Sequence, residues 1–368
     1  MKRRQFLTRA TVTAATAATG ACARREEGAA TSGVSPAKAE FRWKLVTTWP
    51  PNFPALGTGA TAFARMIEKA SNGRIRIKVY GATELVPAFE VFDAVSRGTA
   101  ELGHAGAYYW TGKTQSAAFF SAVPFGFSAT EMNAWLYFGG GLELWREVYA
   151  PFGILPMPCG NSGCQMGGWF NKEIGSIEDL KGLKMRIPGL GGEVLARAGG
   201  TTVTLAGGEI FTALETGAID AAEFIGPYND LAFGLHKAAK YYYYPGWHEP
   251  GSTLECLINQ KAFDSLPPDL QEIVLMAGKA TNDLMLAEIN ARSYEALDQL
   301  VRVHKVQLRA FPTDVLKQLR DLSRKVVEEK AAADPLFRKV HESVVKFETG
   351  IAQWTRIADQ AYLNARSL

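Results

Sequence analysis

Residues 92–104, FDAVSRGTAELGH, align without gaps on residues 211–223, FTALETGAIDAAE. Phenylalanine, alanine and glycine coincide at three of thirteen positions, a match that chance can also produce. Each segment has the pattern of a helix that ends at a glycine, then a tight turn and a buried strand. If the match is real, two lobes share this unit, and His104 and Glu223 lie at equivalent strand ends. Open α/β sheets bind ligands at such ends, so a cleft between two lobes is predicted.

Strand-like and helical runs alternate through most of the chain, which is typical of an α/β fold. Residues 74–80, RIRIKVY, alternate strictly between apolar and charged side chains, as a half-exposed strand does. An apolar content of 47% over 368 residues is ample for two lobes. The predicted organisation is a leader at 1–39, lobe 1 at 40–160 completed by part of 253–310, lobe 2 at 161–252, and returning strands with long helices at 253–368.

Long amphipathic helices are expected near the C-terminus. Pro267 and Pro268 open the first, and two further runs cover residues 313–332 and 335–364. Helices of this length either brace both lobes or form the contact of a homodimer. The brace is the favoured interpretation.

The first nine residues, MKRRQFLTR, resemble a twin-arginine export signal, and a weakly apolar run at 10–21 follows. This run is too short to span a bilayer. We therefore expect export to the periplasm, with residues 1–39 as signal and flexible leader. Cys22 follows a lipobox-like Thr-Gly-Ala, so it is either lipidated or part of a discarded signal.

The charge of the chain does not indicate a nucleic-acid partner. The formal net charge is +3, and cleavage before Cys22 removes four cations and leaves −1. The rest of the chain has no basic run with interleaved aromatic residues. Three cysteines remain after the leader, too few for a disulfide framework. Cys159 and Cys164 either form a short bridge or are small buried thiols.

Catalytic motifs were sought, and none has the required spacing. The glycines at 189–192 lack the third glycine of a dinucleotide-binding loop, and residues 160–164, GNSGC, do not form a nucleophile elbow. His248-Glu249 and His341-Glu342 are not followed by a second histidine at the spacing of a zinc protease. The chain is therefore not expected to be an enzyme.

Four segments resemble a known family: 163–170 (GCQMGGWF), 180–186 (LKGLKMR), 221–227 (AAEFIGP) and 241–249 (YYYYPGWHE). They are similar to the extracytoplasmic solute-binding proteins of TRAP transporters, the DctP-like family, over about residues 41–363. The nearest branch binds 2-oxo monocarboxylates such as pyruvate. The resemblance implies a two-lobe periplasmic-binding-protein fold with a ligand cleft between the lobes.

Arg186 ends a strand-like run and is followed by Ile187 and Pro188. A guanidinium at a strand end can hold a carboxylate with two parallel hydrogen bonds. Spacing alone favours a surface arginine, whereas the resemblance implies that Arg186 holds the carboxylate of the ligand.

Glu223 follows an apolar strand, and a buried carboxylate needs a partner. A salt bridge to a lysine is the simple explanation. The resemblance implies a cation, Na⁺ or Ca²⁺, held by Gln165, Glu223, the carbonyl of Phe224 and Glu249. Gln165 is also expected to touch the ligand, whose carboxylate and 2-oxygen complete the shell. All these donors are hard oxygens, which suit Na⁺ or Ca²⁺ and disfavour zinc. The family commonly has tryptophan at the position of Phe224, a change that preserves the carbonyl.

The remaining candidates for ligand contact are aromatic or polar. Strand alternation places Tyr108 on the same face as His104, and both are predicted to contact the ligand. Tyr109 is the alternative to Tyr108. Trp247 forms either an apolar wall of the site or part of the core, and Asn161 is a further polar candidate.

The predicted function is a receptor that captures a small 2-oxo or 2-hydroxy monocarboxylate, closes around it and delivers it to membrane subunits. Two alternatives remain open: an envelope enzyme acting on small 2-oxo acids, and a binding partner of a sensor kinase.

Overall fold

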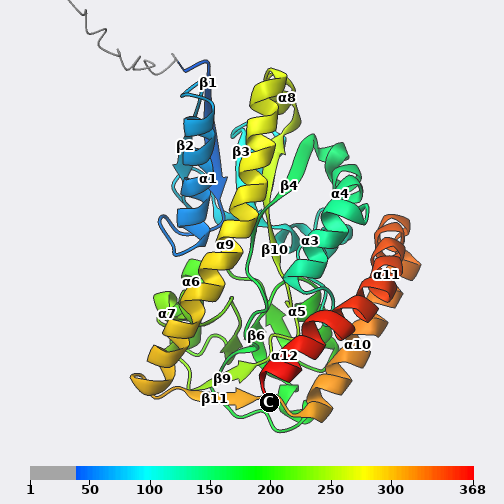
Figure 1. Cartoon of the computed structure of the whole chain (residues 1–368). Helices are drawn as coiled ribbons and strands as arrows, with labels where there is room; N and C mark the ends of the chain where they lie inside the picture. The colour runs from blue at the N-terminus through cyan, green and yellow to red at the C-terminus, as the bar shows by residue number, and fades with distance from the viewer. Residues whose placement is uncertain (1–38) are drawn as a thin grey trace, which may run out of the picture. The chain divides into compact units, whose positions relative to one another are not determined.

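The computed structural model of the chain describes residues 39–368. The predicted export signal and Cys22 lie outside this range. The described part contains two β-sheets, and each forms the centre of one lobe (Figure 1). The two-lobe α/β architecture predicted from the sequence is therefore present. Among these residues, no helix is both long enough and apolar enough to cross a membrane.

The sheet of lobe 1 has five strands. In spatial order they are β2 (Ile75–Tyr80), β1 (Phe41–Thr47), β3 (Leu102–Gly106), β10 (Thr253–Asn259) and β4 (Ile154–Asn161). β1 runs parallel to β2 and β3, whereas β10 runs antiparallel to β3 and β4. The chain therefore leaves this lobe along β4 and returns along β10.

The sheet of lobe 2 has six short strands. In spatial order they are β11 (Gln307–Ala310), β9 (Tyr241–Tyr244), β5 (Gly168–Phe170), β8 (Ala221–Ala222), β6 (Lys184–Arg186) and β7 (Thr201–Val203). β6 and β8 run parallel to each other, whereas β5 runs antiparallel to β8 and β9. The ends of β6 and β8 therefore meet at the same edge of the sheet.

Helices cover both sheets. Those before the last hundred residues are α1 (Leu56–Ala70), α2 (Val91–Ser96), α3 (Ala129–Phe138), α4 (Gly141–Tyr149), α5 (Gly189–Arg197), α6 (Gly207–Glu215), α7 (Pro227–Phe233) and α8 (Gln260–Asp264). Single-turn helices include η1 (Ala88–Glu90), η2 (Ala107–Trp110), η3 (Gln115–Phe120), η4 (Ala150–Phe152), η5 (Ile177–Leu180) and η6 (Leu235–Lys237).

The repeated unit of the sequence has the predicted structure in both lobes. α2 is followed by Gly98 at φ +75° and then β3, and α6 is followed by Gly217 at φ +72° and then β8. Both glycines adopt the left-handed conformation that ends a helix. The equivalence of the strand ends was wrong, however. His104 lies inside β3, paired with Thr47 and Cys256, whereas Glu223 follows the end of β8.

The long C-terminal helices are present as predicted. They are α9 (Pro268–Arg302), α10 (Thr313–Ala333) and α11 (Pro335–Thr355), followed by η7 (Arg356–Gln360) and α12 (Ala361–Arg366). α9 packs on β4 of lobe 1 and on α7 of lobe 2 (Figure 1). α10 packs on α5 of lobe 2, and α11 packs on α3 and α4 of lobe 1. Together the helices contact both lobes.

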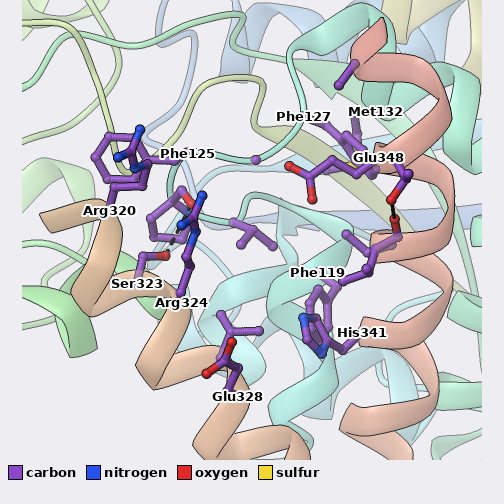
Figure 2. Close-up of a pocket in the computed structure, with 18 residues that line it drawn as sticks. Phe119, Phe125, Phe127, Met132, Arg320, Ser323, Arg324, Glu328, His341 and Glu348 are labelled. Carbon is purple, nitrogen blue, oxygen red and sulfur yellow. Dashed lines mark hydrogen bonds between the residues drawn. The ribbon is translucent and has the colours of Figure 1, made fainter. Parts of the chain in front are cut away.

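Cys159, Cys164 and Cys256 are all free thiols, so the alternative of a bridge between Cys159 and Cys164 was wrong. Cys159 lies in β4 and is buried, whereas Cys164 lies in the connection after β4 and is exposed. A separate cavity of about 560 Å³ lies between α10, α11 and the loop that precedes α3 (Figure 2). Phe119 and Phe127 form part of its apolar lining, and Arg324 and Glu348 lie at its rim. None of the predicted site residues lines this cavity.

Candidate functional site

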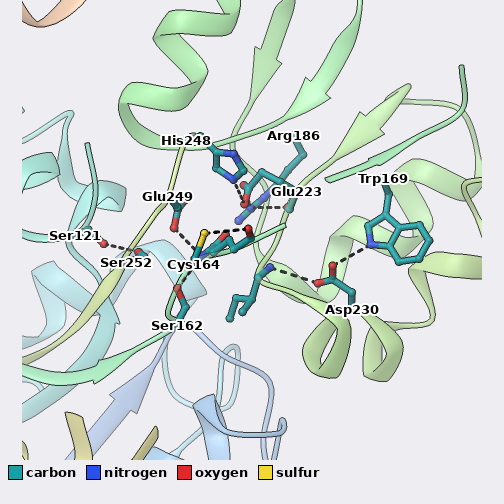
Figure 3. Close-up of polar contacts among 12 residues, drawn as sticks. Ser121, Ser162, Cys164, Trp169, Arg186, Glu223, Asp230, His248, Glu249 and Ser252 are labelled. Atoms are coloured by element: carbon teal, nitrogen blue, oxygen red, sulfur yellow. Dashed lines mark hydrogen bonds and ion pairs between the residues drawn. The ribbon is translucent and has the colours of Figure 1, made fainter. Parts of the chain in front are cut away.

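Arg186 is the last residue of β6, because the following Ile187 and Pro188 lead directly into α5. Only 1% of its side chain is exposed. Its Nη1 donates to the Glu223 carboxylate and, at 3.0 Å, to the Glu223 carbonyl (Figure 3). Nε donates to the carbonyl of Leu205 at 3.2 Å. The guanidinium is therefore fixed in position at the edge of the sheet, and the expectation of a surface arginine was wrong.

Glu223 lies beside Arg186 because β8 runs parallel to β6 and its last residue, Ala222, pairs with Arg186, so that Glu223 follows directly. One carboxylate oxygen accepts from Arg186, and the other lies 3.2 Å from Nε2 of His248. The simple explanation of a lysine partner was therefore wrong. A buried ion pair of this kind costs desolvation free energy and tolerates the loss of neither partner.

Two further predicted cation donors lie next to this pair. Gln165 lies in the connection from β4 of lobe 1 to β5 of lobe 2, and Glu249 lies in the connection from β9 back to β10. Nε2 of Gln165 donates to Glu249 at 2.8 Å. The Gln165 Oε1 is buried and has no hydrogen-bond partner among the described residues. Burial and the nearby charge of Glu223 raise the pKa of the Glu249 carboxyl well above its usual range. Two carboxyl groups thus lie close together, and the Gln165 Oε1 beside them is free to coordinate a cation.

The residues present fit a hard cation. Ligand atoms of Glu223, His248 and Glu249 lie within 4.8 Å of one another. Carboxylate, amide and carbonyl oxygens are the donors that Na⁺ and Ca²⁺ prefer, whereas a single imidazole does not make a zinc site. Phe224 directly follows Glu223 and is buried, and its ring lies 5.6 Å from the Arg186 guanidinium. The Phe224 ring thus packs on the Arg186 guanidinium, which also donates to the Glu223 carboxylate.

His248 is a site residue that the sequence reasoning missed. Its side chain is buried between Glu223 and Trp247, and its Nδ1 has no hydrogen-bond partner within residues 39–368. The available signal was its position next to Glu249 in the segment 241–249. Aromatic residues and the glutamate dominate that segment, and the histidine in it does not fit the spacing of a zinc protease.

Tyr108 and Tyr109 both lie next to the buried charges of the site, but not for the predicted reason. β3 ends at Gly106, and Tyr108 and Tyr109 lie in the turn η2, so strand alternation does not apply to them. The Tyr109 hydroxyl accepts from Nη2 of Arg186 at 3.3 Å. Burial, followed by the charge of Glu249, raises the pKa of Tyr108 well above its usual range. Its hydroxyl is therefore a neutral donor beside the carboxylates.

The polar atoms of His104 are occupied elsewhere. Nδ1 of His104 accepts from Trp49 at 2.7 Å, and Nε2 donates to the Cys159 carbonyl at 2.9 Å. His104 is therefore a neutral imidazole inside the sheet of lobe 1, and this placement does not support its predicted ligand contact.

Asn161 is engaged in the same way. Its Oδ1 accepts from the Gly163 backbone at 2.7 Å, and Nδ2 donates to Thr253 Oγ1 at 3.2 Å. Trp247 stacks on Phe125 with 5.9 Å between ring centroids and is 6% exposed. The structure brings Trp247 to His248 at the site, whereas Asn161 holds the start of the connection between the lobes.

A cavity of about 610 Å³ lies between residues of the two lobes. Thr48 and Phe89 of lobe 1 and Ala206 of lobe 2 all line it. The Phe89 ring lies 5.0 Å from the ring of Tyr109, whose hydroxyl contacts Arg186. The cavity is thus the outer part of the cleft between the lobes.

The family model of bacterial extracellular solute-binding proteins, family 7 (DctP), matches residues 45–334. The chain belongs to this family. A curated relative from Nostoc, a monocarboxylate 2-oxoacid-binding periplasmic protein, is 44% identical over 369 residues, with 100% of this chain and 99% of the relative covered. The family consists of solute-binding proteins, so the prediction that the chain is not an enzyme is confirmed.

Solved structures of TRAP periplasmic solute-binding proteins are similar to this chain over most of its length. One from Colwellia psychrerythraea, with bound calcium and pyruvate, is 45% identical with a TM-score of 0.86, covering 89% of this chain and 99% of that one. One from Pseudoalteromonas atlantica, with bound sodium and pyruvate, is 44% identical with the same TM-score, covering 88% and 99%. One from Bordetella bronchiseptica, a dimer with copurified calcium and picolinate, is 36% identical with a TM-score of 0.88, covering 89% and 98%.

Proposed function

We propose that this protein is the periplasmic receptor of a TRAP transporter for a small 2-oxo or 2-hydroxy monocarboxylate. The observation that carries the proposal is the buried pair of Arg186 and Glu223, which lies next to two cation-type donors, Gln165 and Glu249, that are hydrogen-bonded to each other. Relatives at 44–45% identity hold pyruvate together with calcium or sodium. The same chemistry explains why this chain keeps two buried carboxylates close together.

Arg186 is the proposed clamp for the carboxylate of the ligand. Its guanidinium is planar and permanently charged, so it presents a positive charge in a fixed orientation. Hydrogen bonds to the Leu205 carbonyl and to Tyr109 set the plane of the guanidinium. The hydroxyls of Tyr108 and Tyr109 stay protonated and are available to the ligand's oxygens. Trp247 forms an apolar wall next to His248.

Gln165, Glu223, the Phe224 carbonyl and Glu249 are the proposed holders of Na⁺ or Ca²⁺. A bound cation supplies the positive charge that two facing carboxylates and an electron-rich ligand require in a low-dielectric cleft. These donors come from lobe 2 and from two of the connections between the lobes, β4 to β5 and β9 to β10. Ligand binding in the cleft thereby favours the closed arrangement of the lobes.

Two further parts of the proposal concern the periphery of the protein. Export follows the twin-arginine route, with Cys22 either lipidated or removed, and the receptor delivers its ligand to membrane subunits. The C-terminal helices also form the contact of a homodimer. Large apolar side chains that are 62–65% exposed support that contact, at Trp354, Ile357 and Tyr362.

The test is calorimetric titration of the purified protein with pyruvate in the presence of Na⁺ or Ca²⁺. We expect one ligand per chain, no product by mass spectrometry of the mixture, and much weaker binding of propionate, which lacks the 2-oxygen. Equal affinities for pyruvate and propionate would contradict recognition of a 2-oxo acid.

A further inference from the structure

A second pocket of about 270 Å³ lies on lobe 2, away from the cleft. It is formed where β5 ends and where β9 and β11 begin. β9 and β11 lie side by side (Figure 1). Because β5 runs antiparallel to β8, this edge of the sheet is opposite to the edge that presents Arg186 and Glu223. The pocket is therefore independent of the proposed ligand site.

The lining of this pocket carries nitrogen groups and no carboxylate. His236 and His304 lie with ring centroids 4.2 Å apart, and Lys237, Lys240 and Lys305 surround them. Within the described part of the chain, none of these three lysines forms an ion pair. Asn171 and Gln307 add two side-chain amides. Like charges gathered without a counter-charge repel one another.

His236 shows the effect of this arrangement most directly. Both of its ring nitrogens are shielded from water, and neither has a hydrogen-bond partner among residues 39–368. Burial, then His304 and Lys237, lower the pKa of its imidazole. A buried polar group without a hydrogen-bond partner costs folding free energy, and a ligand or a bound water can supply that partner. When protonated, this ring offers two N–H donors.

We infer that this pocket binds a phosphate group, either as the free anion or on a lipid headgroup. A phosphate has several acceptor oxygens and up to two negative charges, which match two imidazoles, three ammonium groups and two amides. A metal cation is a poor fit to the two histidines, because three lysines surround them. Binding of the anion relieves the repulsion in the pocket and favours the protonated form of His236.

The first experiment follows the ring protons of the five histidines by NMR while inorganic phosphate is added. We expect saturable shifts of His236 and His304, and no comparable shifts with chloride at equal ionic strength. Sulfate keeps its charge across the titration range, and it should raise the pKa of His236 by about one unit, a tenfold coupling. Equal responses to phosphate, sulfate and chloride would overturn the inference.

Matched variants test the residues. The double variant His236→Gln, His304→Gln should lose phosphate binding while its affinity for pyruvate stays unchanged, since the two sites lie at opposite edges of the sheet. His341→Gln, in α11, is the control and should retain the response. Phosphate binding that survives in the double variant would contradict the assignment, whatever the outcome of the pyruvate titrations.

The second experiment separates the two sources of the phosphate group. The protein is sedimented with vesicles of phosphatidylglycerol and, separately, of phosphatidylcholine. Co-sedimentation with the anionic vesicles that is lost in the double variant identifies a lipid headgroup, and NMR binding without co-sedimentation identifies the free anion. If the protein neither binds phosphate by NMR nor co-sediments with anionic vesicles, the phosphate site is refuted.

Discussion

At the scale of single residues, Arg186 and Glu223 are the strongest feature of the site. Each is almost completely buried, and each is the other's counter-charge in the described structure. Such a pair contributes little to net stability compared with well-packed apolar residues. Its presence at the end of two parallel strands is therefore better explained by ligand recognition than by stability.

Substitution of Arg186, the proposed clamp, tests this explanation. Arg186→Lys replaces a planar, fixed guanidinium by a point charge, so pyruvate should bind at least about tenfold more weakly, or about 1.4 kcal/mol. The control is Arg197→Lys, a surface arginine that is 47% exposed and paired with Glu329. Calorimetry should show near-wild-type affinity for the control alone. Unchanged affinity in Arg186→Lys would remove this residue from the site.

Glu255 gives a residue-scale prediction about pH. It is buried in β10, Nε1 of Trp110 donates to it, and burial raises its pKa to about 8. In the unfolded chain this acid ionises at a lower pH than in the folded chain, so its contribution to stability is lost as pH rises from its usual pKa to about 8. The difference in unfolding free energy between wild type and Glu255→Gln should change by about 1.4 kcal/mol per pH unit in this window. A difference that is flat with pH in denaturant titrations would show that Glu255 is ionised in the folded protein.

At the scale of elements, the two glycines that end α2 and α6 are the clearest test of the repeated unit. Gly217 adopts φ +72°, and a Cβ at this position meets no atom within 4 Å, so only the backbone conformation opposes a side chain. Gly217→Ala should therefore lower the unfolding free energy by about 1 kcal/mol. Gly350→Ala, in the exposed interior of α11, should raise it by about 0.5–1 kcal/mol. Thermal unfolding measures the stability of both variants. A change in the same direction for Gly217→Ala and Gly350→Ala would contradict these predictions.

Much of the fold could be predicted because local patterns determine it. The spacing of apolar residues identified β2 and the C-terminal helices, and the glycines at 98 and 217 marked the ends of two helices. The end of β3 could not be predicted, because the turn η2 is held by contacts with η3, β10 and α5, which lie elsewhere in the sequence, rather than by a local breaker. Strand alternation therefore predicted the position of Tyr108 incorrectly, because Tyr108 lies in η2 and not in β3.

The site itself could be predicted only where family resemblance supplied the roles. Gln165, Glu223 and Glu249 come together although they lie far apart in the sequence, and no spacing rule joins them. His104 and Asn161 are polar residues that the tertiary structure uses internally. His248 was missed because a histidine beside a glutamate has no distinctive pattern unless the partner strand that carries Glu223 is known.

At the scale of the whole molecule, the two lobes meet at a cleft, and we propose that this cleft closes around a ligand. A ligand that binds only the folded protein stabilises it by about 2.7 kcal/mol at one hundred times its dissociation constant. Pyruvate should therefore raise the melting temperature when a cation is present, whereas propionate at the same concentration should not. Differential scanning fluorimetry measures both, and equal shifts would mean that the 2-oxygen is not recognised.

The dependence of ligand binding on a cation, through Glu223, tests the central claim most directly. The measurement is calorimetric titration of pyruvate into chelator-treated, sodium-free protein, with Na⁺ and Ca²⁺ added back separately. Wild type should bind only after a cation is restored, and Glu223→Gln, which keeps the shape but removes a charge, should weaken cation and pyruvate together. Glu215→Gln, an exposed glutamate at the end of α6, should behave as wild type. If wild type binds pyruvate equally tightly without any cation and Glu223→Gln matches it, the cation-bridged site is wrong and Glu223 is a structural carboxylate.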